Sequence, residues 1–357
     1  MRFGLIGLGS VRRIRKDALA ALPGSALSAV HDSDRAVADA FADGVKIFET
    51  AEAMFASGLC EAVIVSTPPD THEPLAVAAL QSGKHVIVEK PMANSLESCR
   101  RMIAAARRAG RVLTVGFNHR YFSAIKDLRE AVQSSAIGRL SYVRGFAGHT
   151  GLSEFKAPWM YDKDVMGGGA LMDNGIHMVD LMHHIMGEVE SVSGVVKGDI
   201  WNFDRSEDNA FALLRDRDGL VGSLHASWSE WKGYHFYLEA YGDRGMARAY
   251  YAPMRSRVIS LDKPGGKARV RRRRYLGAEL REKIRGWQST AVDTFVEEIS
   301  DFIALVEDST GSGAIATAID GYRAIEIANA VYRSSESGQT VNLVSPVFDE
   351  EVSSSPD

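Results

Sequence analysis

A glycine-rich turn near the N-terminus has the residue types of a nucleotide-binding loop. Gly7 and Gly9 follow an apolar run, and a helical pattern begins a few residues later. Glycines in this context let the backbone approach a pyrophosphate at a helix N-terminus, so the loop from Gly7 through Ser10, Val11 and Arg12 predicts a dinucleotide site. Arg12 replaces the third glycine of the usual fingerprint, and its guanidinium could also face the phosphates.

Asp32 strengthens this prediction, because it ends the next apolar run and follows Gly9 by 23 residues. A carboxylate at this position accepts hydrogen bonds from ribose hydroxyls, which favours NAD over NADP. The alternative is that Asp32 only caps the following helix. Arg35 keeps NADP as a second possibility, because a nearby arginine can accommodate the 2′-phosphate.

Two further apolar runs end in polar residues. Residues 66–72 read STPPDTH, and Val88 leads into Glu89, Lys90 and Pro91. Ligands of parallel sheets bind outside the carboxyl ends of the strands. Pro91 disfavours helix at Lys90 and so directs the ammonium into that crevice. Taken alone, Glu89 and Lys90 would be a surface ion pair before a turn.

A third group follows a run of three glycines, residues 167–169. Asp173 and His177 stand four residues apart, so a helix would present the carboxylate and the imidazole on one face, where both could act on one substrate. The alternative is a capping aspartate and a core histidine. His184 extends the same face, but a zinc site needs three or four ligands, and we expect no metal.

The elements that must position these groups alternate in the first third of the chain. Apolar runs at residues 2–7, 26–32, 62–67, 85–89 and 112–117 predict buried strands, and residues 34–43, 73–82 and 96–109 have helical spacing. Gly83 and Gly110 are expected to cap two of these helices. This alternation predicts a Rossmann-type, doubly wound parallel sheet.

The rest of the chain is richer in strands. Alternating patterns predict strands at residues 140–148, 191–198, 210–215, 220–228, 236–241 and 257–261, and helices at residues 170–186, 291–307 and 314–334. This pattern predicts an α+β domain with a large, mainly antiparallel open sheet. We expect a first domain over residues 1–122, a second over residues 123–344, and a disordered tail over residues 345–357.

Composition excludes several classes of protein. A chain of 357 residues exceeds the size of one ordinary core, which favours two domains. The 42 basic and 46 acidic residues are too balanced to favour nucleic acid or membrane as the main partner. Two cysteines, Cys60 and Cys99, make no disulfide framework, so we expect a cytoplasmic protein.

Residues 255–285 are an exception to this balance, with twelve basic and three acidic side chains. They predict an exposed basic strand and loop or, alternatively, a clamp for an anionic substrate such as a sugar acid or nucleotide sugar. Nucleic acid is a weaker third alternative, because no recognition motif accompanies the run.

Taken together, these motifs resemble the Gfo/Idh/MocA family, named for glucose-fructose oxidoreductase, inositol dehydrogenase and a rhizopine catabolism protein. The resemblance covers nearly the whole chain. The residues that carry it are Gly7 and Gly9, residues 66–72, residues 83–86 leading into Glu89-Lys90-Pro91, residues 115–120 and residues 167–177.

The resemblance implies a catalytic trio of Lys90, Asp173 and His177. It also implies cofactor contacts, and with the loop residues named above the expected set is Gly7, Gly9, Ser10, Val11, Arg12, Asp32, Thr67, Pro68, His72, Glu89, Lys90 and Asn118. The expected substrate contacts are Lys90, Arg120, Trp159, Lys163, Asp173 and His177. Trp201, Trp228 and Trp231 are equally well explained as core or interface anchors.

The sequence therefore predicts an NAD(P)-dependent oxidoreductase acting on a secondary alcohol of a sugar, a sugar derivative or a cyclitol. His177 is the expected proton acceptor, because a free imidazole titrates near physiological pH, although Lys90 could take this role. Two alternatives are an NAD-using glycosidase or lyase with transient oxidation, and a non-catalytic nucleotide sensor. We expect a homodimer or homotetramer.

Overall fold

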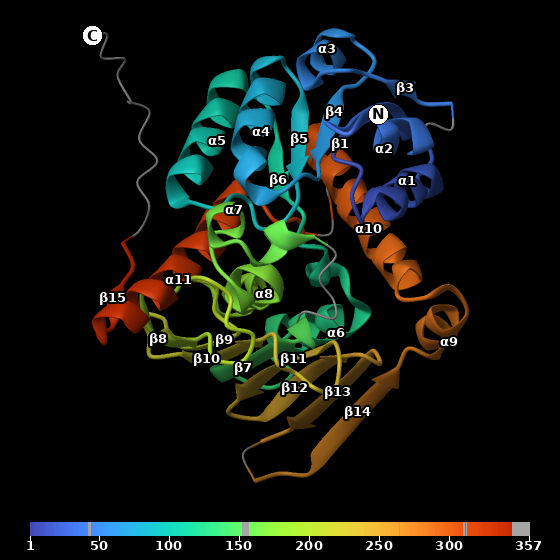
Figure 1. Cartoon of the computed structure of the whole chain (residues 1–357). Helices are drawn as coiled ribbons and strands as arrows, with labels where there is room; N and C mark the ends of the chain where they lie inside the picture. Colours follow the sequence, from blue (N-terminus) through green and yellow to red (C-terminus); the bar gives the residue numbers. More distant parts are fainter. Residues whose placement is uncertain (42–43, 152–156, 264, 310, 312, 345–357) are drawn as a thin grey trace.

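The computed structural model describes residues 1–41, 44–151, 157–263, 265–309, 311 and 313–344. It contains two sheets, of six and nine strands. Figure 1 shows the smaller sheet with its helices above the larger one. The predicted tail, residues 345–357, lies outside the described residues.

The N-terminal sheet is entirely parallel, in the order β3-β2-β1-β4-β5-β6. Its strands are β1 (Arg2–Ile6), β2 (Ala26–His31), β3 (Lys46–Ile47), β4 (Ala62–Val65), β5 (His85–Val88) and β6 (Leu113–Val115). All residues of β4 are fully buried, as expected for a strand covered on both faces. The five predicted strands are confirmed, each ending one or two residues earlier than expected, while β3 was not predicted.

Helices cover this sheet: α1 (Arg12–Ala21), α2 (Arg35–Phe41), α3 (Ala51–Ala56), α4 (His72–Gln81) and α5 (Leu96–Ala109). The predicted helices at 73–82 and 96–109 are confirmed, and α2 covers the described part of the helix expected at 34–43. The short α3 was not predicted; its first turn is capped by the Thr50 hydroxyl, which accepts from the N–H of Ala53 at 3.1 Å.

The sheet order creates the crevice in which ligands of such folds bind. β1 lies between β2 and β4, so the connections after β1 and β4 leave in opposite directions. The carboxyl ends of these two central strands therefore border a topological switch point.

The C-terminal sheet has the order β14-β13-β12-β11-β7-β10-β9-β8-β15. Its strands are β7 (Leu140–Gly148), β8 (Ser191–Lys197), β9 (Asn209–Arg215), β10 (Val221–Ser227), β11 (His235–Gly242), β12 (Gly245–Tyr251), β13 (Arg255–Leu261), β14 (Ala268–Arg274) and β15 (Val341–Asn342). The β7–β10 pair is parallel and the other pairs are antiparallel. The six predicted strands and the mainly antiparallel sheet are confirmed, while β12, β14 and β15 are additional.

Helices pack on one face of this sheet. α6 (Ser123–Gln133) contacts β12 and β13, α8 (Ile176–Met186) contacts β7, and α11 (Ala318–Ser337) contacts β8 (Figure 1). The helix predicted at 170–186 corresponds to α8, which begins later than expected. The helix predicted at 314–334 corresponds to α11, and α6 was not predicted. No helix in the described ranges is long and apolar enough to cross a bilayer.

Helix α10 (Gln288–Val306) returns from the second half of the chain to the first domain. It packs against α1, and its Phe295 and Phe302 join a core cluster with Phe3 and Leu5. The predicted domain boundary at residue 122 follows the order of the chain. By its packing, however, α10 belongs to the N-terminal domain, although it lies far beyond that boundary in the sequence.

The basic segment 255–285 forms β13, β14 and helix α9 (Leu276–Arg285), so its last part is a helix where a loop was expected. β14 is the edge strand, four positions from β7, and its Arg273 pairs with Asp127 on α6. The segment is thus an exposed sheet edge. None of the described residues that line the cleft and pocket below belongs to this segment, and a clamp for an anionic substrate stays an untested alternative.

Candidate active site

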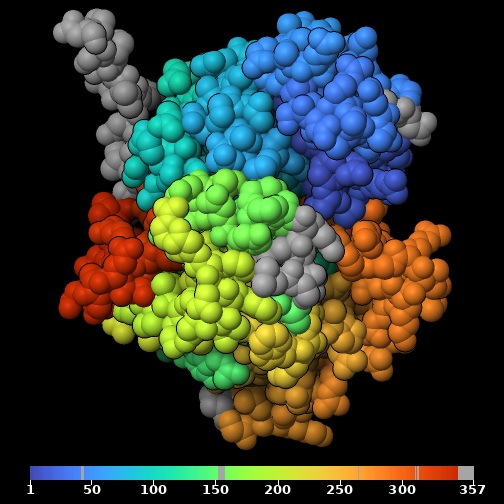
Figure 2. Space-filling view, viewed as in Figure 1, coloured from blue at the N-terminus to red at the C-terminus, as the bar shows by residue number. Residues whose placement is uncertain are grey.

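A cleft of about 690 Å³ lies at the carboxyl ends of β1, β2, β4 and β5. Figure 2 shows the chain around residues 157–170, in green, lying between the blue N-terminal domain and the C-terminal domain. The cleft brings together eleven of the predicted site residues: Gly7, Gly9, Ser10, Val11, Asp32, Thr67, Pro68, Glu89, Lys90, Trp159 and Asp173.

The glycine loop leaves room for a ligand over its backbone. Gly7 has φ of +83°, and a Cβ there would stand 2.4 Å from the carbonyl oxygen of Ser66. Nothing lies within 4 Å of the corresponding position on Gly9. The N–H of Leu8 donates to Oδ2 of Asp32 at 2.7 Å, which ties the loop to the end of β2. This cradle and the adjacent carboxylate fit the pyrophosphate and ribose of a dinucleotide.

Three predicted cofactor contacts make protein contacts instead. Nη1 of Arg12 donates to the carbonyl oxygens of Leu8 and Gly9, at 2.7 and 3.0 Å. The ring of buried His72 lies between the carbonyl oxygens of Thr67 and Pro91, and the amide of Asn118 donates to Thr294. None of the three is among the described residues that line the cleft. The protein itself thus engages all three side chains, and their contact with a cofactor stays a prediction.

Glu89 is held by a buried ion cluster that the sequence did not predict. The guanidinium of Arg15 is fully buried and donates to Oε1 of Glu89 from Nε and Nη2, at 2.9 and 2.5 Å. It also pairs with Glu298 on α10. Burial raises the pKa of Glu298 to about 7, despite the attraction of Arg15. The partners are 74 and 283 residues from Arg15 in the chain, so local spacing carries no sign of them.

A smaller inner pocket, of about 190 Å³, adjoins the cleft. Lys90 and Asp173 line both the cleft and this inner pocket. Its lining residues are Lys90, His149, Met160, Asp173, Asn174, His177 and Tyr234. All three residues of the predicted catalytic trio thus meet in one small polar pocket beside the larger cleft. His149, Asn174 and Tyr234 were not predicted, although the position of His149 directly after the strand expected at 140–148 was a usable signal.

The Asp173 carboxylate is the centre of this pocket. Nζ of Lys90 donates to the Asp173 carbonyl oxygen at 2.8 Å and to Oδ1 at 3.3 Å. Oδ2 accepts from Nε2 of His149 at 2.9 Å and from the indole N–H of Trp228 at 3.0 Å. Burial opposes ionisation, but Lys90 and these donors outweigh it and hold the pKa of Asp173 well below its usual value.

The local fold around Asp173 differs from the expected regular helix. Residues Leu171–Gly175 form a π-helical turn, and α8 begins only at Ile176. The buried carboxylate of Glu207 accepts from the N–H groups of Gly169 and Leu171, both at 2.8 Å. Glu207 therefore holds the glycine run that feeds the turn, and such turns are common at functional sites. No local pattern pointed to Glu207.

His177 stacks on His119, with ring centroids 3.7 Å apart. Burial, with His119 and Lys90 nearby, lowers the pKa of His177 well below its usual value. Burial and Lys90 likewise lower the pKa of His119 to about 3. Both rings are therefore neutral at physiological pH, which corrects the expectation that His177 titrates there. Nδ1 of His177 is fully buried without a hydrogen-bond partner among the described residues, so Nε2 is the nitrogen left to meet a ligand.

Two predicted substrate contacts lie outside these spaces. Arg120 is buried. Its Nε and Nη2 donate to the Asp180 carboxylate at 2.8 and 2.6 Å, and Nη2 lies 3.2 Å from the Asp320 carboxylate. Nζ of Lys163 lies 5.9 Å from the centroid of the Tyr332 ring. Arg120 is therefore held in a buried ion pair, and the substrate contacts expected for Arg120 and Lys163 stay predictions. Trp159 does line the cleft, and is 36% exposed.

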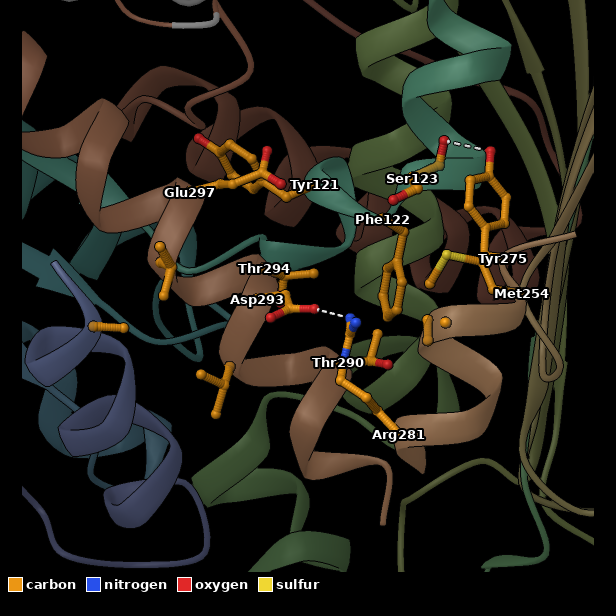
Figure 3. Close-up of a pocket in the computed structure, with 15 residues that line it drawn as sticks. Tyr121, Phe122, Ser123, Met254, Tyr275, Arg281, Thr290, Asp293, Thr294 and Glu297 are labelled. Carbon is orange, nitrogen blue, oxygen red and sulfur yellow. Dashed lines mark hydrogen bonds and ion pairs between the residues drawn. The ribbon is translucent and has the colours of Figure 1, made fainter. Parts of the chain in front are cut away.

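A second cavity, of about 590 Å³, lies between α9, α10 and the start of α6. Figure 3 shows Arg281 pointing toward Asp293, with which it forms an ion pair, and the Tyr275 hydroxyl donating to the carbonyl oxygen of Ser123 at 3.1 Å. None of its lining residues in the described chain is a predicted site residue. The predicted catalytic residues line the cleft and the inner pocket.

Comparison with known families agrees with this geometry. Residues 1–117 match the model described as the oxidoreductase family with NAD-binding Rossmann fold. Residues 125–248 match the model of the GFO/IDH/MocA C-terminal domain. Both halves of the architecture therefore have counterparts in one family.

Individual relatives match over most of the chain. The myo-inositol 2-dehydrogenase of Thermotoga maritima is 30% identical over 96% of this chain and 98% of its own length. The glucose-6-phosphate 3-dehydrogenase of Bacillus subtilis is 28% identical over 62% of this chain and 64% of its own. A levoglucosan dehydrogenase, solved in complex with NADH and L-sorbose, shares the fold at a TM-score of 0.83 and 22% identity, over 96% of this chain and 98% of that one. The glycine cradle, the polar pocket and these matches together show that the chain belongs to the Gfo/Idh/MocA family of NAD-binding oxidoreductases.

Proposed function

We propose that this protein transfers a hydride between NAD and a secondary alcohol of a sugar, a sugar derivative or a cyclitol. The observation that carries the proposal is the meeting of Lys90, Asp173 and His177 in one inner pocket that opens on the glycine cradle. Relatives named for inositol, glucose 6-phosphate and levoglucosan support this range of substrates.

In this proposal the residues of the pocket handle the hydroxyl group. Nζ of Lys90, held by Asp173, donates to the reacting oxygen and stabilises its developing negative charge. Neutral His177 is the proposed acceptor of the hydroxyl proton, at Nε2, with Lys90 as the alternative. Burial and the Lys90 ammonium disfavour a charged His177, so the proton moves to it only as the hydride leaves. NAD⁺, held by Gly7, Gly9 and Asp32, would supply the hydride acceptor, so that the carbon bearing this hydroxyl loses a hydride and the alcohol becomes a ketone.

Asp173 acts here as a positioning group for Lys90. Its carboxylate receives donors from three sides, which fixes its orientation and its negative charge. Asn174 and Tyr234 also line the pocket and would contact the other hydroxyl groups of the substrate. A ligand with several hydroxyls suits such a lining, because each buried polar group must find a partner.

NAD is proposed over NADP because Asp32 lines the cleft close to the loop. Its negative charge would repel a 2′-phosphate. Arg35, the residue that kept NADP in consideration, is already paired with Asp39 at 2.9 Å on the surface of α2.

A screen of sugars, sugar acids, inositols and nucleotide sugars with NAD and NADP tests the proposal. The expected result is net accumulation of NADH with at least one of these compounds. Product formation without net NADH would favour a glycosidase or lyase with transient oxidation. Binding of NAD with no turnover of any compound would favour a nucleotide sensor.

A homodimer or homotetramer is part of the same proposal. On the sheet face opposite the helices, Val195, Phe211 and Leu213 are 56%, 44% and 55% exposed. An apolar face of this kind on a wide open sheet suits burial against a second copy. Light scattering at micromolar concentration should show two or four subunits, and a monomer would refute this part.

A further inference from the structure

Three tryptophans continue outward from the Asp173 carboxylate, and we call Trp201, Trp228 and Trp231 the outer aromatic cluster. Two hydrogen bonds and one ring contact link them in series. The indole N–H of Trp228 donates to Oδ2 of Asp173 at 3.0 Å. The indole N–H of Trp201 donates to the carbonyl oxygen of Trp228 at 2.8 Å. The rings of Trp201 and Trp231 are 5.6 Å apart between centroids. The cluster therefore leads from the inner pocket to the surface.

Burial falls steeply along this series. Trp228 is fully buried, whereas Trp231 is 67% exposed, although it rests against Trp201. Trp231 lies in the loop that leads to Tyr234, which lines the inner pocket. The N–H of its neighbour Glu230 donates to the carbonyl oxygen of His149, another lining residue, at 3.0 Å, which holds this loop next to the pocket. An indole that is held by a neighbouring ring but open to water presents a preformed aromatic surface beside the pocket.

The inner pocket is too small for a large ligand. Its volume of about 190 Å³ is below the roughly 300–1,000 Å³ typical of sites for drug-sized molecules. A substrate with two rings must therefore place only its reacting ring between Lys90 and His177. The second ring would lie outside, where the outer aromatic cluster reaches the surface.

We propose that Trp231, supported by Trp201, is a distal subsite for a second ring of the substrate, so that the preferred substrate is a glycoside and not a free monosaccharide or cyclitol. This inference rests on the proposed function, since it extends the same substrate site. Contact with an exposed indole buries apolar surface on both partners and requires no hydrogen-bond match, so the subsite accepts either a sugar ring or an aromatic aglycone.

The test compares each of three sugars with its phenyl-linked partner: D-glucose with phenyl β-D-glucoside, D-galactose with phenyl β-D-galactoside, and D-xylose with phenyl β-D-xyloside. NADH formation gives kcat/KM for both members of a pair. Saturation-transfer NMR on the protein with NAD reports whether the phenyl protons touch it. The variants are Trp231→Ala and Trp231→Phe, with Trp287→Ala as the matched control, because Trp287 is also exposed, at 56%, but precedes α10 on another part of the surface.

For at least one pair, the glycoside should exceed the free sugar at least about tenfold in kcat/KM. Trp231→Ala should reduce that ratio to near one while kcat/KM for the free sugar changes less than about twofold. Trp231→Phe should retain part of the preference, and Trp287→Ala all of it. The inference would be overturned if Trp231→Ala left the ratio of glycoside to free-sugar kcat/KM unchanged. Equal kcat/KM for the two members of every pair would also overturn it.

The NMR readout separates this inference from the proposed function. Phenyl saturation transfer that depends on Trp231, without NADH formation from any of these compounds or of those in the screen above, would support the subsite and contradict the dehydrogenase proposal. NADH formation with free sugars, without saturation transfer to the phenyl protons, would support the dehydrogenase proposal and contradict the subsite. Absence of both signals with all six compounds would contradict the subsite. If Trp231→Ala instead changes the number of subunits in light scattering, Trp231 is an interface residue and the inference is wrong.

Discussion

His149 and Asp173 are joined by a hydrogen bond of 2.9 Å between Nε2 and Oδ2. Nδ1 of the same imidazole accepts from the backbone N–H of Gly151 at 3.0 Å. Because Nδ1 is an acceptor, the proton of the neutral ring is on Nε2 and points at the carboxylate. His149 therefore favours the ionised form of Asp173, which in turn holds the ammonium of Lys90.

Removing this donor should lower the rate without removing any group that touches the substrate's reacting oxygen. His149→Ala leaves Oδ2 with Trp228 alone, and a hydrogen bond to a charged group contributes about 1.5–3 kcal/mol. We expect kcat to fall about ten- to a hundredfold with the substrate found in the screen. His149→Gln, which can still donate, should recover part of the loss. Equal rates for the alanine variant and the unmodified protein would contradict this role.

Lys90 and His177 are expected to carry the chemistry. Lys90→Ala and His177→Ala should each lower kcat by on the order of 10²-fold or more, because general acid-base catalysis contributes roughly that much. NAD affinity, measured by calorimetry, should change little in either variant. Lys197→Ala, which removes a surface lysine paired with Asp199, is the control. Near-full kcat in both alanine variants would place the catalytic groups elsewhere.

Cofactor choice depends on Asp32. The unmodified protein should bind NAD more tightly than NADP, and Asp32→Ala should narrow the difference, because the carboxylate no longer repels a 2′-phosphate. Because Asp32 also accepts from the N–H of Leu8, the variant should weaken NAD binding as well. Titration of both cofactors against both proteins measures the two effects. Tighter NADP binding by the unmodified protein would make Arg35 the residue to examine.

His119 should make stability depend on pH. Its pKa is about 3 in the folded protein and near 6.5 in an unfolded chain, so between these values the unfolded state binds more protons and stability falls as pH decreases. One proton corresponds to about 1.4 kcal/mol per pH unit, hence roughly 2 kcal/mol between pH 6.5 and 5. His119→Phe should therefore lose less stability than the unmodified protein over this interval. Thermal unfolding at both pH values measures the difference, and equal losses would exclude His119 as its source.

The local sequence pattern was sufficient to predict most helices and strands, and to predict the site residues that directly follow strands. Strand runs such as 62–67 and helical spacing such as 96–109 are set by side-chain periodicity, which is a property of neighbouring residues. In a parallel sheet the carboxyl ends of all strands lie at one edge. The sequence alone therefore predicted that Gly7, Asp32, Thr67 and Lys90 share one cleft.

Only the tertiary structure decided which side chains reach the cleft and which are used internally. Arg120 and Asn118 are predicted site residues, yet Asp180 and Thr294 engage them. His149 and Trp228 reach Asp173 from 24 and 55 residues away. The lowered pKa of His177 likewise arises from burial and from a stacked ring 58 positions earlier in the chain. Periodicity and motif spacing describe neighbours along the chain, whereas hydrogen-bond partners and burial depend on packing between distant segments, which is why these features required the three-dimensional structure.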